Sequence, residues 1–104
     1  MINALTAQEA RELIARGDLD VVDVREPGEW SRGHVPGSRL VPLNKLRSGL
    51  KAELQRDGII FVCAAGVRSQ TAAQLAEAGG FAQLYNLVGG TRSWVEAGLP
   101  LVRD

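Results

Sequence analysis

The feature that most constrains the fold is a continuous apolar run, Ile59-Ile60-Phe61-Val62, that stops at Cys63. Four consecutive β-branched or aromatic residues indicate a buried strand. Residues 64–66 are small, and the helical pattern that begins near Ser69 ends at Gly79-Gly80. The chain therefore places its only thiol where a buried strand ends and a helix is about to begin.

The rest of the chain alternates in the same way. Thr6 and Glu9 have the spacing of a capping box, which predicts the start of a helix that Gly17 ends. Strands are predicted at 19–24, 40–43 and 84–88, helices at 46–54 and 91–97, and an irregular connection with one helical turn at 25–37. This alternation predicts a parallel α/β sheet with helices on both faces. Ligands of such folds bind beyond the carboxyl ends of the strands, where Cys63 is expected to lie.

Length and charge exclude several classes of protein. The 104 residues suffice for one modest core, so we expect one domain over residues 1–104. Basic and acidic residues both number 12, and no basic stripe points to nucleic acid. No apolar run approaches the ~20 residues of a membrane span, and the N-terminal segment lacks the pattern of a signal peptide. We therefore expect a cytoplasmic protein that binds neither nucleic acid nor membrane.

The chain has one cysteine and one histidine, which limits its metal and redox chemistry. A single cysteine cannot form an internal disulfide, and it leaves the chain without a resolving thiol. One Cys and one His cannot by themselves hold a structural zinc ion. We expect no metal and no organic cofactor.

Cys63 is a candidate nucleophile because the residues after it can stabilise a thiolate. An unperturbed thiol, with a pKa of roughly 8.5, is only about 3% ionised at neutral pH. The backbone N–H groups of residues 64–68 can turn inward as an anion-binding nest, and Gly66 can supply a positive φ. The start of the next helix and the guanidinium of Arg68 would add positive charge. The alternative is that Cys63 is only a small buried hydrophobe.

Three parts of the chain resemble the rhodanese family of sulfurtransferases. They are the loop Cys63-Ala64-Ala65-Gly66-Val67-Arg68-Ser69, the segments Asp23-Val24-Arg25-Glu26-Pro27, Glu29-Trp30 and Gly33-His34-Val35-Pro36-Gly37-Ser38, and Leu84-Tyr85-Asn86-Leu87-Val88-Gly89-Gly90 with Trp94. The resemblance covers essentially the whole chain and implies a three-layer α/β fold with a central, mainly parallel five-stranded sheet. Trp30, where Phe or Tyr is commoner, and Ser38, where Ala is usual, are minor departures.

The resemblance implies a two-step transfer of sulfur. The thiolate of Cys63 attacks the outer sulfur of a small anionic donor such as thiosulfate, sulfite leaves, and a persulfide remains. Cyanide, a thiol or a protein acceptor then removes the outer sulfur. The residues expected to bind the donor are Ala64, Ala65, Gly66, Val67, Arg68 and Ser69. Behind them, Asp23 and Arg25 would pair with each other or brace the loop.

Other readings of the same loop stay open. A Cys-dependent phosphatase or arsenate reductase has a longer loop between Cys and Arg than the four residues found here, and this shorter loop suits one sulfur atom better than phosphate. A mercaptopyruvate donor is less consistent with Arg68. A regulatory or persulfide-relay module for a protein partner is a further alternative. The other notable residues of these segments are interpreted as structural. They are His34, Trp30, Trp94 and the Gly89-Gly90 turn.

Overall fold

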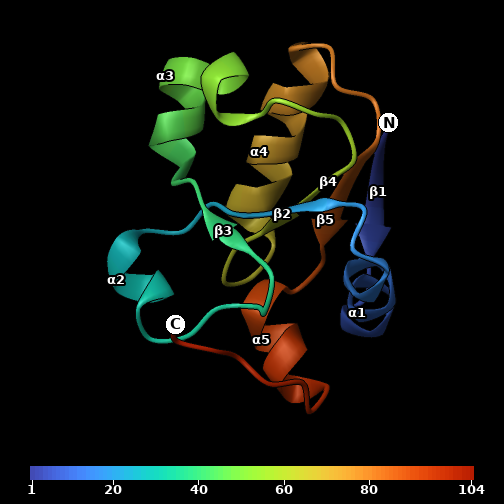
Figure 1. Ribbon diagram of the computed structural model, residues 1–104, viewed down its shortest axis with the longest axis vertical. Coiled ribbons are helices and arrows are strands. Elements are labelled where there is room, and N and C mark those ends of the chain that lie inside the picture. Colours follow the sequence, from blue (N-terminus) through green and yellow to red (C-terminus); the bar gives the residue numbers. More distant parts are fainter.

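The computed structural model describes residues 1–104, in which a five-stranded sheet is covered by helices on both faces (Figure 1). The strands are β1 (Ile2–Leu5), β2 (Asp20–Asp23), β3 (Arg39–Leu40), β4 (Ile59–Val62) and β5 (Leu84–Leu87). The helices are α1 (Ala7–Arg16), α2 (Pro27–Trp30), α3 (Leu43–Glu53), α4 (Val67–Ala78) and α5 (Gly90–Glu96). The strand order is β1-β5-β4-β2-β3 with every pair parallel, which confirms the predicted α/β architecture.

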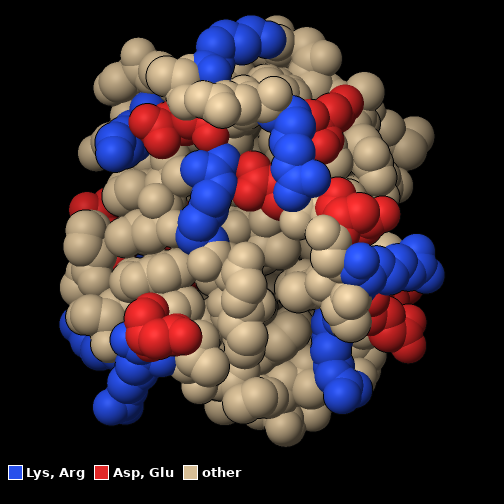
Figure 2. Space-filling model, viewed as in Figure 1, with Lys and Arg blue, Asp and Glu red and all other residues tan.

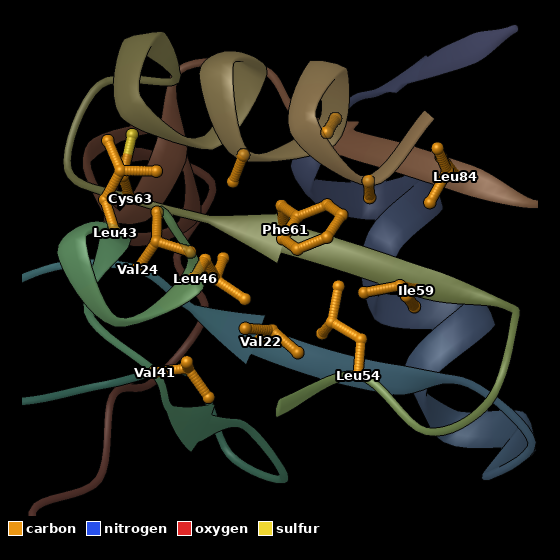
Figure 3. Packing of buried hydrophobic residues seen from close by; sticks show 13 residues of the cluster. Val22, Val24, Val41, Leu43, Leu46, Leu54, Ile59, Phe61, Cys63 and Leu84 are labelled. Carbon is orange, nitrogen blue, oxygen red and sulfur yellow. The ribbon is translucent and has the colours of Figure 1, made fainter. Parts of the chain in front are cut away.

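The central strand β4 divides the apolar core between the two faces of the sheet. All four of its residues are fully buried, and successive side chains point to opposite faces. Ile59 and Phe61 pack into one cluster with residues of α3 and α4, as Figure 3 shows. Ile60 and Val62 pack into a second cluster with residues of α1 and α5. The apolar run in the sequence therefore serves both layers at once.

The helices form the two outer layers, with α3 and α4 above the sheet and α1 and α5 below it in the view of Figure 1. Helix α4 presents Ala72, Ala73 and Ala76 to the sheet, and all three are fully buried. Small side chains at this face let the helix backbone lie close to β4 and β5. Helix α1 begins with the predicted capping box between Thr6 and Glu9 and ends at Gly17 with φ 78°.

Several local features differ from the sequence predictions. Strand β3 is Arg39–Leu40 where a strand was predicted at 40–43, and α3 begins at Leu43, three residues before its predicted start. Strand β1 was not among the predicted strands. It lies at the sheet edge and pairs with β5, which follows it by some 80 residues. Helix α4 begins at Val67, two residues earlier than expected, because Gly66 adopts a left-handed conformation and forms its N-cap. Gly49 interrupts α3 with φ −157° and ψ 63°, an interruption that its low helix propensity explains.

The surface carries charges of both signs. On the face shown in Figure 2, Lys and Arg side chains lie among Asp and Glu side chains, and no stripe of one sign runs across the molecule. No helix combines the length and the apolar character that crossing a membrane requires.

Candidate active site

Cys63 lies immediately beyond the carboxyl end of β4, at the end of the apolar cluster where Val24 and Leu43 pack (Figure 3). The residue is 1% exposed, so burial alone would make it a small core hydrophobe. Its surroundings are nevertheless polar on one side, because the loop after β4 curls back over the sulfur. The site is therefore the junction between an apolar core and a ring of backbone donors.

Two backbone N–H groups point at the sulfur of Cys63. The N–H of Gly66 donates to Sγ over 3.1 Å, and the N–H of Ser69 donates over 3.4 Å. Gly66 has a backbone φ of 95°, a value that residues other than glycine rarely adopt. Ser69 lies in the first turn of α4, where backbone N–H groups have no partner within the helix and can bind an anion. One of these donors, Gly66, lies within the 64–68 nest predicted from the sequence, and the other, Ser69, lies one residue beyond it.

The loop keeps the Cys63 thiol acidic despite its burial. Burial is the largest single influence and raises the pKa of the thiol. The hydroxyl and N–H of Ser69, with the N–H groups of Ala65 and Gly66, act in the opposite direction and together outweigh it. The pKa of Cys63 consequently lies below its ordinary value. A larger share of the residue is then the nucleophilic thiolate at neutral pH.

The first turn of α5 forms backbone hydrogen bonds with the start of the Cys63 loop. The N–H of Thr91 donates to the Cys63 carbonyl over 2.9 Å, and the N–H of Arg92 donates to the Ala64 carbonyl over 3.2 Å. A Cβ atom on Gly66 would lie 3.0 Å from the backbone nitrogen of Gly89. A Cβ on Gly90 would collide with the backbone of Cys63 and Ala64. The Gly89-Gly90 turn is therefore the place where two backbones pass in close contact beside the site.

Arg68, which the sequence predicts to add positive charge beside the thiol, is engaged in an ion pair. Its two terminal nitrogens donate to both carboxylate oxygens of Glu29 on α2, over 2.7 and 2.9 Å. The hydrogen bond from Arg68 lowers the pKa of Glu29 to about 2. In return Glu29 contributes most to the raised pKa of Arg68, and the charges of Cys63 and Asp23 raise it further. The positive charge beside the thiol is therefore partly compensated in the resting protein.

Asp23 and Arg25 form a buried ion pair at the end of β2, the strand that pairs with β4. Arg25 donates from Nε and Nη2 to the Asp23 carboxylate over 2.8 to 3.0 Å, and Nη2 also donates to the Gly33 carbonyl over 2.8 Å. The pair thus ties β2 to the connection that contains α2. Because α2 carries Glu29, the pair also supports the position of Arg68.

The histidine and both tryptophans make structural contacts. The His34 ring stacks on Trp30, with ring centroids 3.5 Å apart, and its Nδ1 lies 3.1 Å from the Trp30 carbonyl. The His34 backbone also bridges to Val102. Trp94 is 4% exposed and donates from Nε1 to the Pro100 carbonyl. None of these contacts reaches the loop at 64–69.

Asn86 is a site residue to which the sequence analysis gave no role. It lies on β5, is 6% exposed, and accepts a hydrogen bond from the Ser69 hydroxyl over 2.5 Å. Its amide nitrogen donates to the Gly66 carbonyl and to Gln70 Oε1, each over 3.2 Å. The sequence did contain one signal for this role: Asn86 is an amide in an otherwise apolar predicted strand. A buried amide requires hydrogen-bond partners, so its side chain could be expected to contact other polar groups.

The thiol opens into no surface cavity. Four surface cavities are present, and Cys63 lines none of them. The largest, about 510 Å³, lies beside Asp20 and Arg39, at the end of β2 away from the site. The loop exposes Ala65 and Val67 and has no bulky side chain between Cys63 and Gly66.

Known proteins are similar to this chain in sequence. The chain is 37% identical to YqhL of Bacillus subtilis over 95 residues, which cover 90% of this chain and 73% of that protein. It is 31% identical to the human thiosulfate:glutathione sulfurtransferase, with 85% of this chain and 89% of the human protein covered.

Solved structures agree in fold. A rhodanese-related protein from Thermoplasma volcanium superposes with a TM-score of 0.86 at 33% identity, covering 98% of this chain and 99% of that one. A protein from Rhodopseudomonas palustris described as a possible tyrosine phosphatase gives 0.88 at 33% identity, covering 97% and 85%. Residues 6–97 match the family described as the Rhodanese-like domain. With its Cys63 loop closed over the end of β4, this chain belongs to the rhodanese-like family.

Proposed function

We propose that this protein is a sulfurtransferase that moves sulfane sulfur from an anionic donor such as thiosulfate to a thiophilic acceptor. The observation that carries the proposal is the single thiol of Cys63, which receives hydrogen bonds from the N–H groups of Gly66 and Ser69. A relative with 31% identity is named for transfer of sulfur from thiosulfate to glutathione, which supports the same class of donor and acceptor.

In the first step the thiolate of Cys63 attacks the outer sulfur of thiosulfate. The sulfur–sulfur bond of the donor breaks, and its electron pair leaves with sulfite. Cys63 then carries a persulfide whose negative charge is on the outer sulfur. Backbone N–H groups around the loop can stabilise this charge as they stabilise the thiolate, so neither step requires a general base at the nucleophile.

In the second step an acceptor thiolate or cyanide attacks the outer sulfur. The persulfide bond breaks, its electron pair returns to Cys63 Sγ, and the original thiolate is restored. The chain has no second cysteine that could intercept the persulfide. The sulfur must therefore pass to another molecule, either a small thiol or a protein acceptor.

The residues of the loop have different roles in the proposed transfer. Ala64, Ala65, Gly66 and Val67 form the short curve past which a donor approaches, and Ser69 contacts the sulfur directly. Arg68 supplies the positive charge that attracts the donor anion, moderated by Glu29. Asp23 and Arg25 act on the site by holding α2 in place. The reactive thiol must stay reduced between turnovers, which suits the cytoplasm.

A thiosulfate-to-cyanide assay on the wild type and Cys63→Ser tests the proposal. We expect thiocyanate formation by the wild type and none above background by the variant, because serine cannot form the persulfide. Circular dichroism of both proteins controls for folding. Mass spectrometry after incubation with thiosulfate alone should show a gain of one sulfur atom on the wild type only. Turnover by a correctly folded Cys63→Ser protein would remove Cys63 from the mechanism.

A phosphatase is the second candidate, favoured by the fold it shares with the Rhodopseudomonas palustris protein. The four-residue spacing between Cys63 and Arg68, and the ion pair of Arg68 with Glu29, leave little room for a tetrahedral phosphate. We expect no hydrolysis of p-nitrophenyl phosphate above that of Cys63→Ser. Brisk hydrolysis by the wild type, without sulfur transfer, would favour the phosphatase.

A further inference from the structure

The side chains of Asn86, Ser69 and Cys63 form a hydrogen-bonded chain whose polarity is fixed at one end. The Gly66 carbonyl can only accept, so the amide NH2 of Asn86 must face it, and this places Asn86 Oδ1 against Ser69. An amide oxygen can only accept as well. The Ser69 hydroxyl therefore donates its proton to Asn86, over 2.5 Å.

The same hydroxyl is within hydrogen-bond distance of the Cys63 sulfur. Ser69 Oγ lies 3.3 Å from Cys63 Sγ, and either atom could donate. A hydroxyl has one proton, and in this arrangement Asn86 holds it. Ser69 then offers Cys63 only a lone pair, which can accept from a thiol S–H but gives a thiolate nothing. On the side of the Ser69 hydroxyl this arrangement suits the neutral thiol, while the backbone N–H groups of Gly66 and Ser69 still donate to the sulfur.

Ionisation of Cys63 reverses the requirement. A thiolate needs donors, and rotation of the Ser69 hydroxyl can turn its proton from Asn86 Oδ1 to Sγ. The rotation leaves Asn86 Oδ1, which is buried, without its donor, and this has a free-energy cost. Asn86 and Cys63 therefore compete for one proton through Ser69.

We propose that Asn86 is a positioning residue, which holds the Ser69 proton away from Cys63 and releases it when negative charge develops on the sulfur. Its role in turnover depends on the sulfur transfer proposed above. In the persulfide the charge lies on the outer sulfur, and the hydroxyl remains on Asn86. When an acceptor attacks the outer sulfur, the persulfide bond breaks and its electron pair moves to Sγ. The Ser69 proton then turns to the departing thiolate.

The proposed variants change none of the other charged groups around the thiol. Arg68 on α4 is paired with Glu29 on α2, and Asp23 with Arg25 beyond β2. On α5, Arg92 meets the loop through its backbone N–H, which donates to Ala64. Asn86 also donates to the carbonyl of Gly66, whose N–H binds the sulfur. A shift in the titration of Cys63 is therefore assigned to the Asn86–Ser69 chain when it disappears in the Ser69→Ala background.

The test is the pH dependence of alkylation of Cys63 by iodoacetamide, which reports one thiol because the chain has only one. In Asn86→Ala the hydroxyl is free to donate to the sulfur. We expect the midpoint of thiolate formation to fall by about one pH unit, the effect of one hydrogen bond to a charged group. Ser69→Ala removes the donor, and its midpoint should rise. In the Ser69→Ala background, Asn86→Ala should not lower the midpoint.

Gln70→Ala is the matched control, because it removes the second partner of the Asn86 amide and leaves the Ser69–Asn86 bond intact. Its midpoint should equal that of the wild type. The wild type gives a second measurement that requires no substitution: the side-chain NH2 resonances of Asn86 should titrate with the midpoint of Cys63. A raised or unchanged midpoint in Asn86→Ala, or an equal fall with and without Ser69, would overturn the proposal. So would Asn86 resonances that do not follow Cys63. None of these measurements uses a sulfur donor, so their failure is separate from failure of the transfer assay.

Discussion

At the scale of single residues, the charge that meets an anionic donor is set by Glu29 as much as by Arg68. The two side chains form a bidentate pair whose members are about one third exposed, at 30% and 36%. Arg68 therefore has nitrogens directed at a carboxylate and not at open solvent. A donor anion must either compete with Glu29 or bind the remaining face of the guanidinium. Glu29 is thus a determinant of donor affinity in the proposed reaction.

Glu29→Gln should strengthen the use of thiosulfate, because it removes the charge that compensates Arg68. We expect the KM for thiosulfate to fall by about 3- to 10-fold, equivalent to roughly 0.6–1.4 kcal/mol for one partly screened charge. The difference should shrink as salt is raised. Glu12→Gln, on the exposed side of α1, makes the same change in net charge and should leave the KM unaltered. A higher KM in Glu29→Gln would mean that Glu29 holds Arg68 in its binding position.

The same pair should make stability depend on pH in the acidic range. The pKa of Glu29 is lowered from 4.5 to about 2, so the folded protein stabilises the carboxylate. That contribution is present above pH 4.5 and is lost as the pH falls toward 2. Because both side chains are partly exposed, it amounts to about 1 kcal/mol or less. Urea unfolding should show the wild type more stable than Glu29→Gln at pH 6, with the gap closing near pH 2. A gap that persists unchanged at pH 2 would contradict the assignment.

The residues of the site differ in how far sequence alone could place them. Cys63, Gly66 and Ser69 lie within one loop, so local rules on strand ends and helix starts bring them together. Glu29 precedes Arg68 by 39 residues, and only the folded connection after β2 sets it opposite the guanidinium. Asn86 reaches the site because β5 lies beside β4. Contacts made by sheet order carry no local signal.

At the scale of elements, the loop after β4 works only if two backbones can approach each other. Gly66 combines a positive φ with a close neighbour, since a Cβ there would lie 3.0 Å from Gly89 N and 3.4 Å from the Leu87 carbonyl. Gly17 at the end of α1 also has a positive φ, 78°, but a Cβ there would meet nothing within 4 Å. Replacing Gly17 by alanine therefore measures the cost of the left-handed backbone conformation alone. Replacing Gly66 by alanine measures that cost plus the cost of the steric clash.

Gly66→Ala should lower both stability and thiol acidity, whereas Gly17→Ala should lower stability alone. We expect about 1 kcal/mol for the left-handed conformation at either position, and a further ~1–3 kcal/mol at Gly66 from the clash. Displacing the Gly66 N–H also removes a hydrogen bond to the thiolate, so the midpoint of alkylation of Cys63 should rise. Urea titrations and iodoacetamide rates measure the two effects. Equal behaviour of both variants would mean that crowding at Gly66 is relieved by the loop.

Elements with strong local signals were predicted well, and an element without one was missed. The capping box of Thr6 and Glu9 and the stop at Gly17 gave both ends of α1. Strand β1 has the sequence Ile-Asn-Ala-Leu, in which Asn3 and Ala4 are exposed and have low strand propensity. It becomes a strand because β5 offers an open edge, with Ile2 opposite Leu84. The start of α4 was misplaced by two residues because the N-cap is a glycine, which gives no side-chain capping signal.

At the scale of the whole molecule, one sheet joins two separate apolar clusters. β4 contributes Ile59 to the cluster beneath α3 and α4, and Ile60 to the cluster that contains Trp94 of α5. Both isoleucines are fully buried. If residues 1–104 form one cooperative domain, damage to either cluster should be felt equally in both. Ile59 and Ile60 are neighbours in sequence on opposite faces, so they allow the same chemical change to be made on each side.

Ile59→Val and Ile60→Val are two single variants, and each should lower the thermal midpoint of unfolding. Within each variant, both probes should report the same midpoint. Each change removes one buried methyl group, which costs about 0.5–1.5 kcal/mol. For a domain of this size, 1 kcal/mol corresponds to roughly 4–8 °C in the midpoint. Far-UV circular dichroism reports the whole fold. The chain also has Trp30, so both variants are made in a Trp30→Phe background, where tryptophan fluorescence reports Trp94 alone, whose cluster contains Ile60 but not Ile59. Coincident transitions in both variants would mean that the faces unfold as one unit. A fluorescence transition that Ile60→Val shifts and Ile59→Val does not would show that the two layers unfold separately, and the Cys63 loop would then depend on only one of them.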